Sequence, residues 1–148
     1  MGNDRVRPRL AETRRHPVSN RIQKFVEAMH VQPNDRILEI GCGHGIAASL
    51  ICRQLKNGIY VGIDRSPKMI AVAAKRNAEF VNVSRAAFVL ASLESFDPGL
   101  QRFDKVFAMR VRIFHDNPLE AKRLTECWLA RNGRLFVEYD EPLRTMVK

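Results

Sequence analysis

The sequence predicts an α/β fold, with a doubly wound and mainly parallel sheet that carries helices on both faces. Short apolar runs alternate along the chain with stretches whose apolar residues recur at helical spacing, which is the pattern of a parallel sheet crossed by helices. The first run, residues 37–40, leads into a turn with glycines at positions 41, 43 and 45. The second run, residues 60–63, closes on Asp64. An acid in this place, after a glycine turn, is typical of domains that bind a nucleoside.

The elements before and after the glycine turn follow from apolar spacing. Ile22, Phe25, Val26 and Met29 recur at helical spacing, so residues 18–30 are expected to form an amphipathic helix. A turn at residues 32–35 then leads into the first strand. Apolar residues from position 46 to 55 predict the helix that follows the glycines.

Capping residues locate the later helices. Ser66 followed by Pro67 is a typical helix start, and Asn117 followed by Pro118 is another. Asn132 and Gly133 are expected to stop the second of these helices. The remaining elements are therefore helices over residues 67–80 and 119–130, and strands over 87–90, 103–108 and 134–139.

The glycine spacing indicates which nucleoside ligand fits. Glycine has no Cβ, so the backbone can approach a ligand closely and adopt positive φ. The dinucleotide fingerprint is G-x-G-x-x-G, but here the third glycine, Gly45, comes one residue early. Glu39 precedes the glycines, and its carboxylate would repel a pyrophosphate. It would instead suit a ligand that carries an ammonium and a sulfonium group.

At these residues the chain resembles the class I S-adenosylmethionine-dependent methyltransferases. Their first motif is an acid, any residue, then G-x-G-x-G, and residues 39–45 read E-I-G-C-G-H-G. Their second motif is an acid that closes the second strand, which Asp64 matches. The resemblance runs from about residue 36 to residue 142. It implies S-adenosyl-L-methionine as the cofactor, with Asp64 on the ribose hydroxyls. A similar domain with an empty or altered site is the alternative.

The resemblance also suggests further cofactor contacts. Ser92 stands where the family has an acid for the adenine amino group, and Leu93 can lie against the ring or belong to the core. Arg110 and Arg112 either hold an anionic acceptor or are solvated. The residues expected to bind the cofactor are Glu39, Gly41, Cys42, Gly43, Gly45, Asp64, Arg65, Ser92, Leu93, Met109 and Arg110.

Methyl transfer requires little from side chains, because in-line displacement at a sulfonium depends mainly on holding the methyl group near the acceptor atom. A base matters only when the acceptor must lose a proton. His44 is expected to shape the glycine turn. We assign no catalytic residue and no metal ligand, since none of the candidates near the strand ends stands in a motif: His115, Glu138, Tyr139, Asp140 and Glu141.

Composition bounds the organisation and location of the chain. Its 148 residues suit one domain, expected over residues 18–148, after a basic arm at residues 1–17 with five arginines. No apolar run approaches 18 residues, so no membrane span is expected, and the arginine-rich start does not resemble a secretory leader. Three cysteines without a C-x-x-C pair argue against a disulfide framework or a zinc site and suit the cytoplasm.

The charge leaves the methyl acceptor open. The net charge is +9 and the pI is near 10.1, which attracts nucleic acid. The basic residues are spread out, however, and no nucleic-acid-binding motif is present. A small-molecule acceptor is favoured, a nucleic-acid methyltransferase is the second hypothesis, and a non-catalytic cofactor-binding or interaction module is the third.

The end of the chain suggests an assembly. The family's sheet has seven strands, and residues 141–148 are too few for the last two strands with their connecting helix, so these are expected to be missing. The strand at 134–139 would then be a bare edge, with Leu135, Phe136 and Val137 open to pairing. A homodimer through this edge is expected, or a C-terminal segment supplied by a partner or by a longer chain. The alternative is a monomer whose tail, residues 142–148, covers the edge.

Overall fold

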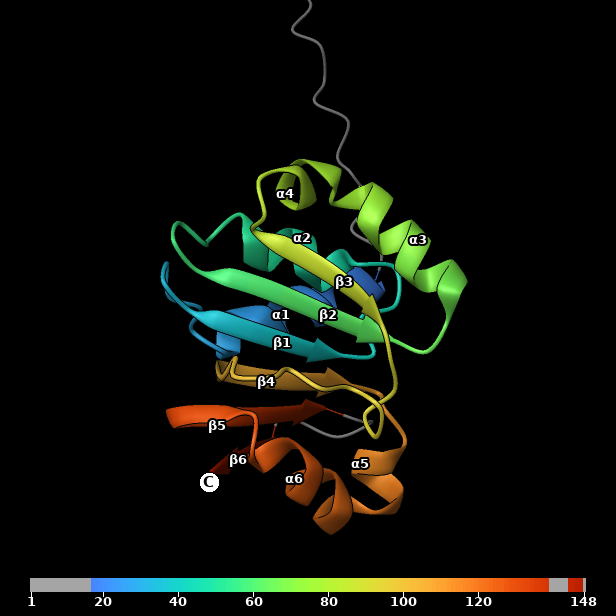
Figure 1. Cartoon of the computed structure of the whole chain (residues 1–148), viewed down its shortest axis with the longest axis vertical. Coiled ribbons are helices and arrows are strands. Elements are labelled where there is room, and N and C mark those ends of the chain that lie inside the picture. Colours follow the sequence, from blue (N-terminus) through green and yellow to red (C-terminus); the bar gives the residue numbers. More distant parts are fainter. Residues whose placement is uncertain (1–16, 139–143, 148) are drawn as a thin grey trace, which may run out of the picture.

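The computed structural model describes residues 17–138 and 144–147, and within them one six-stranded sheet. The strands are β1 (Arg36–Ile40), β2 (Ile59–Asp64), β3 (Ala86–Leu90), β4 (Phe103–Met109), β5 (Leu129–Glu138) and β6 (Arg144–Val147). They lie in the order β3-β2-β1-β4-β5-β6. The first five are mutually parallel, so their carboxyl ends meet at one edge (Figure 1). The predicted α/β sheet is thus confirmed.

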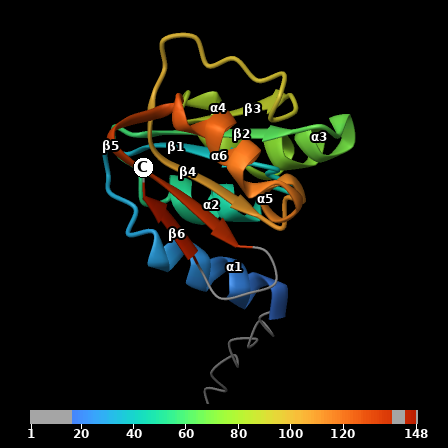
Figure 2. The same cartoon turned by 90° about the horizontal axis from the view of Figure 1, so that it is seen from below.

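Helices cover both faces of this sheet. Figure 2, seen along the sheet from below, shows α1 and α2 on one side and α6 on the other. One buried cluster joins α1 and α2 to that face, around Phe25, Ile51 and Phe107. The second cluster joins the opposite face to Phe114, Ala121 and Trp128. The helices are α1 (Pro17–Ala28), α2 (Ile46–Cys52), α3 (Pro67–Arg76), α4 (Ala78–Asn82), α5 (Ile113–Asp116) and α6 (Pro118–Glu126).

Strand β1 shows why the apolar runs are nearly continuous. Ile37 packs into the first cluster and Leu38 into the second, and both are fully buried. Successive side chains of a strand point to opposite faces, and a parallel sheet has both faces covered. Every position of such a strand therefore favours an apolar residue, so the buried Glu39 is an exception that needs a functional or structural reason.

Several predicted boundaries are wrong. The strand expected from residue 134 begins at Leu129, and the helix expected to reach residue 55 ends at Cys52. The helix expected over residues 67–80 is divided at Asn77, whose side chain donates to the Ala73 and Gly45 carbonyls at 2.9 and 3.0 Å. The helix expected to reach residue 130 ends at Glu126. Asn132, with φ of 64°, does not stop that helix but lies inside β5, where the pairing with β4 shifts register between Phe103 and Lys105.

The C-terminal edge also differs from the prediction. Residues 134–137 of β5 pair antiparallel with β6, so the expectation of a bare strand-five edge is wrong. One further strand is present where two were expected to be missing. The homodimer rested on that bare edge and now stays a prediction without this support, whereas the tail alternative matches the observed pairing.

Deleting residues 144–148 should increase self-association. Without β6, the N–H and C=O groups of residues 134–137 lose their backbone partners and become available to another chain. Light scattering across a dilution series would show a larger, concentration-dependent mass for the shortened chain than for the full chain. Equal masses at every concentration would contradict an edge-protecting role for β6.

Other expectations fall partly or wholly outside the described residues. The predicted basic arm, residues 1–17, lies outside them except for Pro17, which begins α1. Over the part of the chain that is described, no helix combines the length and apolar character needed to cross a membrane.

Ser66 and Asn117 cap α3 and α6 as expected, by accepting from the Met69 and Glu120 amides.

Candidate functional site

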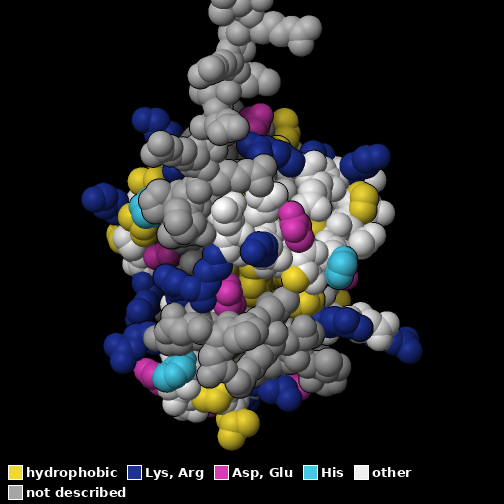
Figure 3. All heavy atoms as spheres, turned by 180° about the vertical axis from the view of Figure 1, so that it is seen from behind, with side chains coloured by type: hydrophobic (Ala, Val, Ile, Leu, Met, Phe, Trp, Pro, Cys, Tyr) yellow, Lys and Arg dark blue, Asp and Glu magenta, His cyan; other side chains and the backbone are white. Residues whose placement is uncertain are grey.

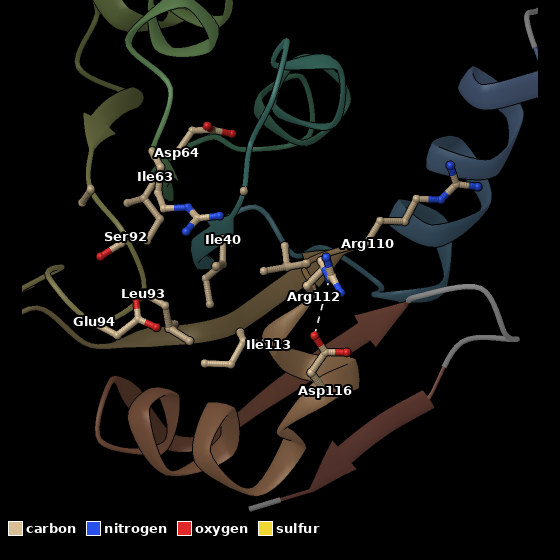
Figure 4. A pocket seen from close by; sticks show the side chains of 14 residues that line it. Ile40, Ile63, Asp64, Ser92, Leu93, Glu94, Arg110, Arg112, Ile113 and Asp116 are labelled. Atoms are coloured by element: carbon tan, nitrogen blue, oxygen red, sulfur yellow. Dashed lines mark ion pairs between the residues drawn. The ribbon is translucent and has the colours of Figure 1, made fainter.

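Two cavities open at the edge where β1, β2 and β4 end, and they share a wall. The larger, about 560 Å³, extends over the ends of β2 and β3 to α5 (Figure 4). The smaller, about 230 Å³, lies between the glycine turn and α1. Gly41 and Arg110 line both cavities. A ligand that extends from one cavity into the other would therefore lie against Gly41 and Arg110.

The glycine turn forms this shared wall because all three glycines have positive φ, at 75° for Gly41, 51° for Gly43 and 79° for Gly45. The turn is tied to β2 by the amides of Gly41 and Cys42, which donate to the Ile63 carbonyl at 2.8 and 2.9 Å. Only glycine adopts this conformation without strain. The glycines of this local sequence thus fix the shape of the wall that the two cavities share.

The three glycines differ in what surrounds them. A Cβ at Gly45 would lie 2.7 Å from Asn77 Nδ2 and 2.9 Å from Ala73 Cβ, so this glycine allows α3 to pack on the turn. A Cβ at Gly43 would meet nothing within 4 Å, and Gly43 lines the smaller cavity. Gly45 therefore serves packing, whereas Gly43 faces the space that a ligand would fill.

Asn77 holds the turn against α3 and α4. Its side chain is fully buried and donates to the Gly45 carbonyl, while its oxygen accepts from Ser49 Oγ at 2.7 Å. Arg76 adds a bond from Nε to the His44 carbonyl at 3.0 Å. These contacts satisfy groups that burial would otherwise leave unpaired, and they fix the position of the turn.

Asp64 closes β2 at the wall of the larger cavity, as the sequence predicts. One carboxylate oxygen accepts from the Gly43 amide at 3.0 Å and the other from the Ser66 amide at 2.9 Å. Each oxygen of a carboxylate can accept a second bond. The side chain is therefore oriented by the backbone and still offers acceptors to a diol in the cavity.

Glu39 lies in the wall of the smaller cavity and is only 4% exposed. Tyr60, on β2, donates to its carboxylate at 2.6 Å. Burial raises the pKa of Glu39 to about 8; the Tyr60 hydrogen bond lowers it and the Asp64 charge raises it further. The carboxyl is consequently protonated at neutral pH in the empty site. An incoming cation would favour its charged form.

Cys42 is also buried beside the smaller cavity. Burial, followed by the charges of Glu39 and Asp64, raises the pKa of its thiol to about 12. The neutral thiol is a poor nucleophile, so Cys42 fills space in the turn. All three cysteines are free thiols, and the described residues contain no group of side chains able to hold a metal ion.

The rim of the larger cavity carries the predicted residues Arg65, Ser92 and Leu93. Leu93 is 6% exposed and belongs to a core cluster as well as to the cavity wall, so its core role is observed and its contact with the ring stays a prediction. The Ser92 hydroxyl forms a turn with Ser95 at 3.0 Å, and Figure 4 shows it directed away from Ile40 and Arg112. Glu94 offers a carboxylate on the same rim.

The end of β4 lines both cavities through Arg110 and is held near α1 by contacts with Glu138. Arg110 has a positive φ of 56°, and its amide donates to the Glu138 carbonyl at 2.7 Å. Arg21 on α1 donates through Nε to Glu138 Oε1 at 2.9 Å. The other Glu138 oxygen is buried and has no hydrogen-bond partner among the described residues. Glu138 itself lines neither cavity, but it holds Arg21, which lines the smaller one.

The structure brings most of the predicted residues together. His115, a candidate base, is instead exposed and contacts Asp116 at 3.1 Å, while Tyr139, Asp140 and Glu141 lie outside the described residues. Glu39, Cys42, Gly43 and Met109 line the smaller cavity; Asp64, Arg65, Ser92 and Leu93 line the larger; Gly41 and Arg110 line both; and Gly45 lines neither.

Sequence reasoning missed residues whose roles depend on distant contacts. Tyr60 looked like a core residue of an apolar strand, although an aromatic hydroxyl near a buried acid is a usable signal once the strands are aligned. Asn77 lies in a stretch that the sequence predicts as one amphipathic helix, and its neighbouring residues do not indicate that its amide is buried. Nothing in the sequence connects Arg21 on α1 with the glycine turn.

Comparison with known proteins gives the family. Residues 37–131 match the family model described as a methyltransferase domain. The ribosomal protein L11 methyltransferase of Ralstonia nicotianae is 39% identical over 122 residues, which covers 82% of this chain and 37% of the relative. The 18S rRNA (guanine(1575)-N(7))-methyltransferase of Saccharomyces cerevisiae is 29% identical over 77 residues, covering 47% of this chain and 28% of the relative.

A solved structure agrees in fold. Coclaurine N-methyltransferase, bound to N-methylheliamine and S-adenosylhomocysteine, superposes with a TM-score of 0.71 at 18% identity, covering 81% of this chain and 35% of that one. The fold and the glycine-turn site define a Rossmann-like domain of the methyltransferase class. The chain belongs to the methyltransferase domain family. It spans little more than a third of the length of the Ralstonia relative.

Proposed function

We propose that this chain binds S-adenosyl-L-methionine and transfers its methyl group to an acceptor by in-line displacement. The single observation that carries the proposal is the pair of cavities that meet over Gly41, with Asp64 on one side and Glu39 on the other. The cofactor has a nucleoside at one end and an amino acid at the other. The two cavities offer each end a separate space with a suitable carboxyl.

The residues present fit this cofactor. Asp64 would accept from the ribose hydroxyls, held in place by its bonds to the Gly43 and Ser66 amides. Glu39 would receive the ammonium group, and Arg21 and Arg110 provide positive charge in the same cavity for the carboxylate. Ser92 is engaged with Ser95, so Glu94 is the better candidate for the adenine amino group.

When bound, the cofactor supplies a methyl group on a sulfonium, which is a good leaving group. The protein must then place the acceptor in line with that methyl group and exclude water. Glu138 lines neither cavity, and we assign it no part in proton transfer; Arg21 orients its carboxylate through their ion pair.

We propose a small-molecule acceptor, because the mouth is formed by a few convergent side chains. Arg110 and Arg112 line the larger cavity, and Arg112 is already paired with Asp116 at 3.4 Å. The RNA alternative is supported by the net charge of +9 and by the yeast rRNA relative. On the face seen in Figure 3, however, Lys and Arg side chains are scattered over the surface, with acidic side chains between them.

A methyl-transfer assay tests both parts of this proposal. The chain is incubated with methyl-labelled S-adenosylmethionine and, separately, with the small metabolites, the proteins and the RNA of the source organism. We expect label to appear in the metabolite pool. Label in RNA or protein would overturn the acceptor class and keep the activity, whereas no label in any pool would overturn catalysis.

A further inference from the structure

Tyr60 reaches Glu39 through a space that a glycine keeps open. Glu39 on β1 is the register partner of Gly62 on β2, and Tyr60, two residues earlier, points to the same face of the sheet. A Cβ at Gly62 would lie 2.6 Å from the Tyr60 hydroxyl. The absence of that atom lets the hydroxyl pass across the strand to Glu39, where the hydrogen bond is 2.6 Å long.

This contact is almost fully enclosed. Tyr60 is 1% exposed and Glu39 is 4% exposed. Burial followed by the Glu39 and Cys42 charges raises the pKa of Tyr60 well above its usual value of 10, so the phenol remains a neutral donor. A charged carboxylate with one neutral hydrogen-bond donor is poorly compensated in such an environment. The pair therefore favours a neutral carboxyl until a cation arrives.

The other charged and titratable groups around Glu39 come from several elements. The charge of Asp64 at the end of β2 acts against the charged carboxylate, and the Cys42 thiol in the turn is neutral. Arg21 from α1, His44 from the turn and Arg110 from the end of β4 line the same cavity. The neighbouring position on β4 is the apolar Phe107. Among the described residues, Tyr60 makes the only hydrogen bond to the Glu39 side chain.

We infer that Tyr60 is a positioning residue that holds Glu39 for the ammonium group of the methyl donor, and that donor binding requires Glu39 to release a proton. The inference rests on the proposed function, since it concerns the same cofactor. The carboxyl O–H bond breaks and its proton leaves to solvent, while the ligand ammonium keeps its proton and pairs with the new carboxylate. The Tyr60 hydroxyl donates throughout and is not consumed.

The expected pH dependence follows from this exchange. With the Glu39 pKa at about 8 in the empty site, the charged carboxylate is abundant above that value and becomes scarce as the pH falls. Affinity should therefore fall about tenfold for each pH unit below 8. The ligand's own α-amino group loses its proton as the pH rises further, so affinity should decline again at high pH. The best binding is expected at about pH 8 or above it.

The first test uses the unaltered protein and needs no variant. S-adenosylhomocysteine is titrated at about pH 6.5 in two buffers of different ionisation enthalpy, and the difference in heat gives the protons exchanged. We expect about one proton to be released for each ligand bound. Binding without proton release would overturn the inference and leave the proposed function intact. Absence of binding at every pH would overturn the proposed function itself.

The second test isolates Tyr60. In Tyr60→Phe, the hydrogen bond that favours the charged carboxylate is lost, so S-adenosylhomocysteine should bind about tenfold more weakly at about pH 6.5. At about pH 9 the free carboxyl is mostly charged in the unaltered protein and about half charged in the variant, so the difference in affinity should shrink to about twofold. The ratio of the two dissociation constants at each pH removes the titration of the ligand.

A matched control removes a buried hydroxyl elsewhere. Thr125 on α6 is fully buried and donates to the Ala121 carbonyl at 2.9 Å. It lines neither of the two cavities at the glycine turn. Thr125→Val should leave the affinity unchanged at both pH values. An equal loss of affinity at both pH values in Tyr60→Phe would show a merely structural role for Tyr60 and overturn the inference.

Discussion

Replacing Asp64 with alanine should weaken S-adenosylhomocysteine binding by about 2 kcal/mol, a factor of roughly thirty. The substitution removes charge-assisted hydrogen bonds to the ribose hydroxyls. It also frees the Gly43 and Ser66 amides, which now donate to this carboxylate at 3.0 and 2.9 Å. Calorimetric titration of the two proteins under the same conditions measures the difference.

Asp104 provides the matched control for this substitution. It too accepts from a backbone amide, that of Arg36 at 2.8 Å, but at the opposite end of the strands. Asp104→Ala should leave the affinity unchanged. If both alanine variants lose affinity equally, the effect comes from general destabilisation, and Asp64 has no special part in binding.

Two glycines of the turn should separate stability from binding. Gly45→Ala places a Cβ against Asn77 and Ala73 at a φ of 79°, so the free energy of unfolding should fall by about 3 kcal/mol from strain and overpacking together. Gly43→Ala also has positive φ but meets nothing within 4 Å. Its stability should fall by only about 1 kcal/mol.

Ligand affinity should respond more directly to the change at Gly43 than to the change at Gly45. The Cβ of Gly43→Ala projects into open space beside the smaller cavity, where it competes with the ligand, so this folded variant should lose affinity. Denaturant unfolding followed by calorimetry on each variant measures both properties. Similar stabilities for the two variants, or full affinity in Gly43→Ala, would contradict the distinct roles assigned to these glycines.

The part of the site that the sequence predicted is the part encoded locally. The turn at residues 39–45 and Asp64 each follow an apolar strand directly, and strand ends on a parallel sheet meet at one edge. The fold could be predicted for the same reason, since β1 to β5 each contain a short apolar run. The end of a strand and the turn that follows it can be recognised from a few consecutive residues.

The rest depends on contacts between distant segments. Tyr60 acts on Glu39 because the register places Gly62 beside that acid, and register is a property of two strands. Asn77 divides a helix in order to bond the Gly45 carbonyl, 32 residues earlier. Arg21 meets Glu138 across 117 residues. The pairing of β6 with β5 was predicted only as the alternative to a dimer, because a short tail carries too few residues to show a strand pattern.

The central claim is that the two cavities over Gly41 hold one S-adenosyl cofactor. Calorimetric titration of S-adenosylhomocysteine into the chain at about pH 8, where the Glu39 carboxylate and the ligand ammonium can coexist, tests it most directly. The predicted result is saturable binding of one ligand per chain, weakened in Asp64→Ala and unchanged in Asp104→Ala. Absence of binding at roughly millimolar ligand, a free energy weaker than about −4 kcal/mol, would contradict it.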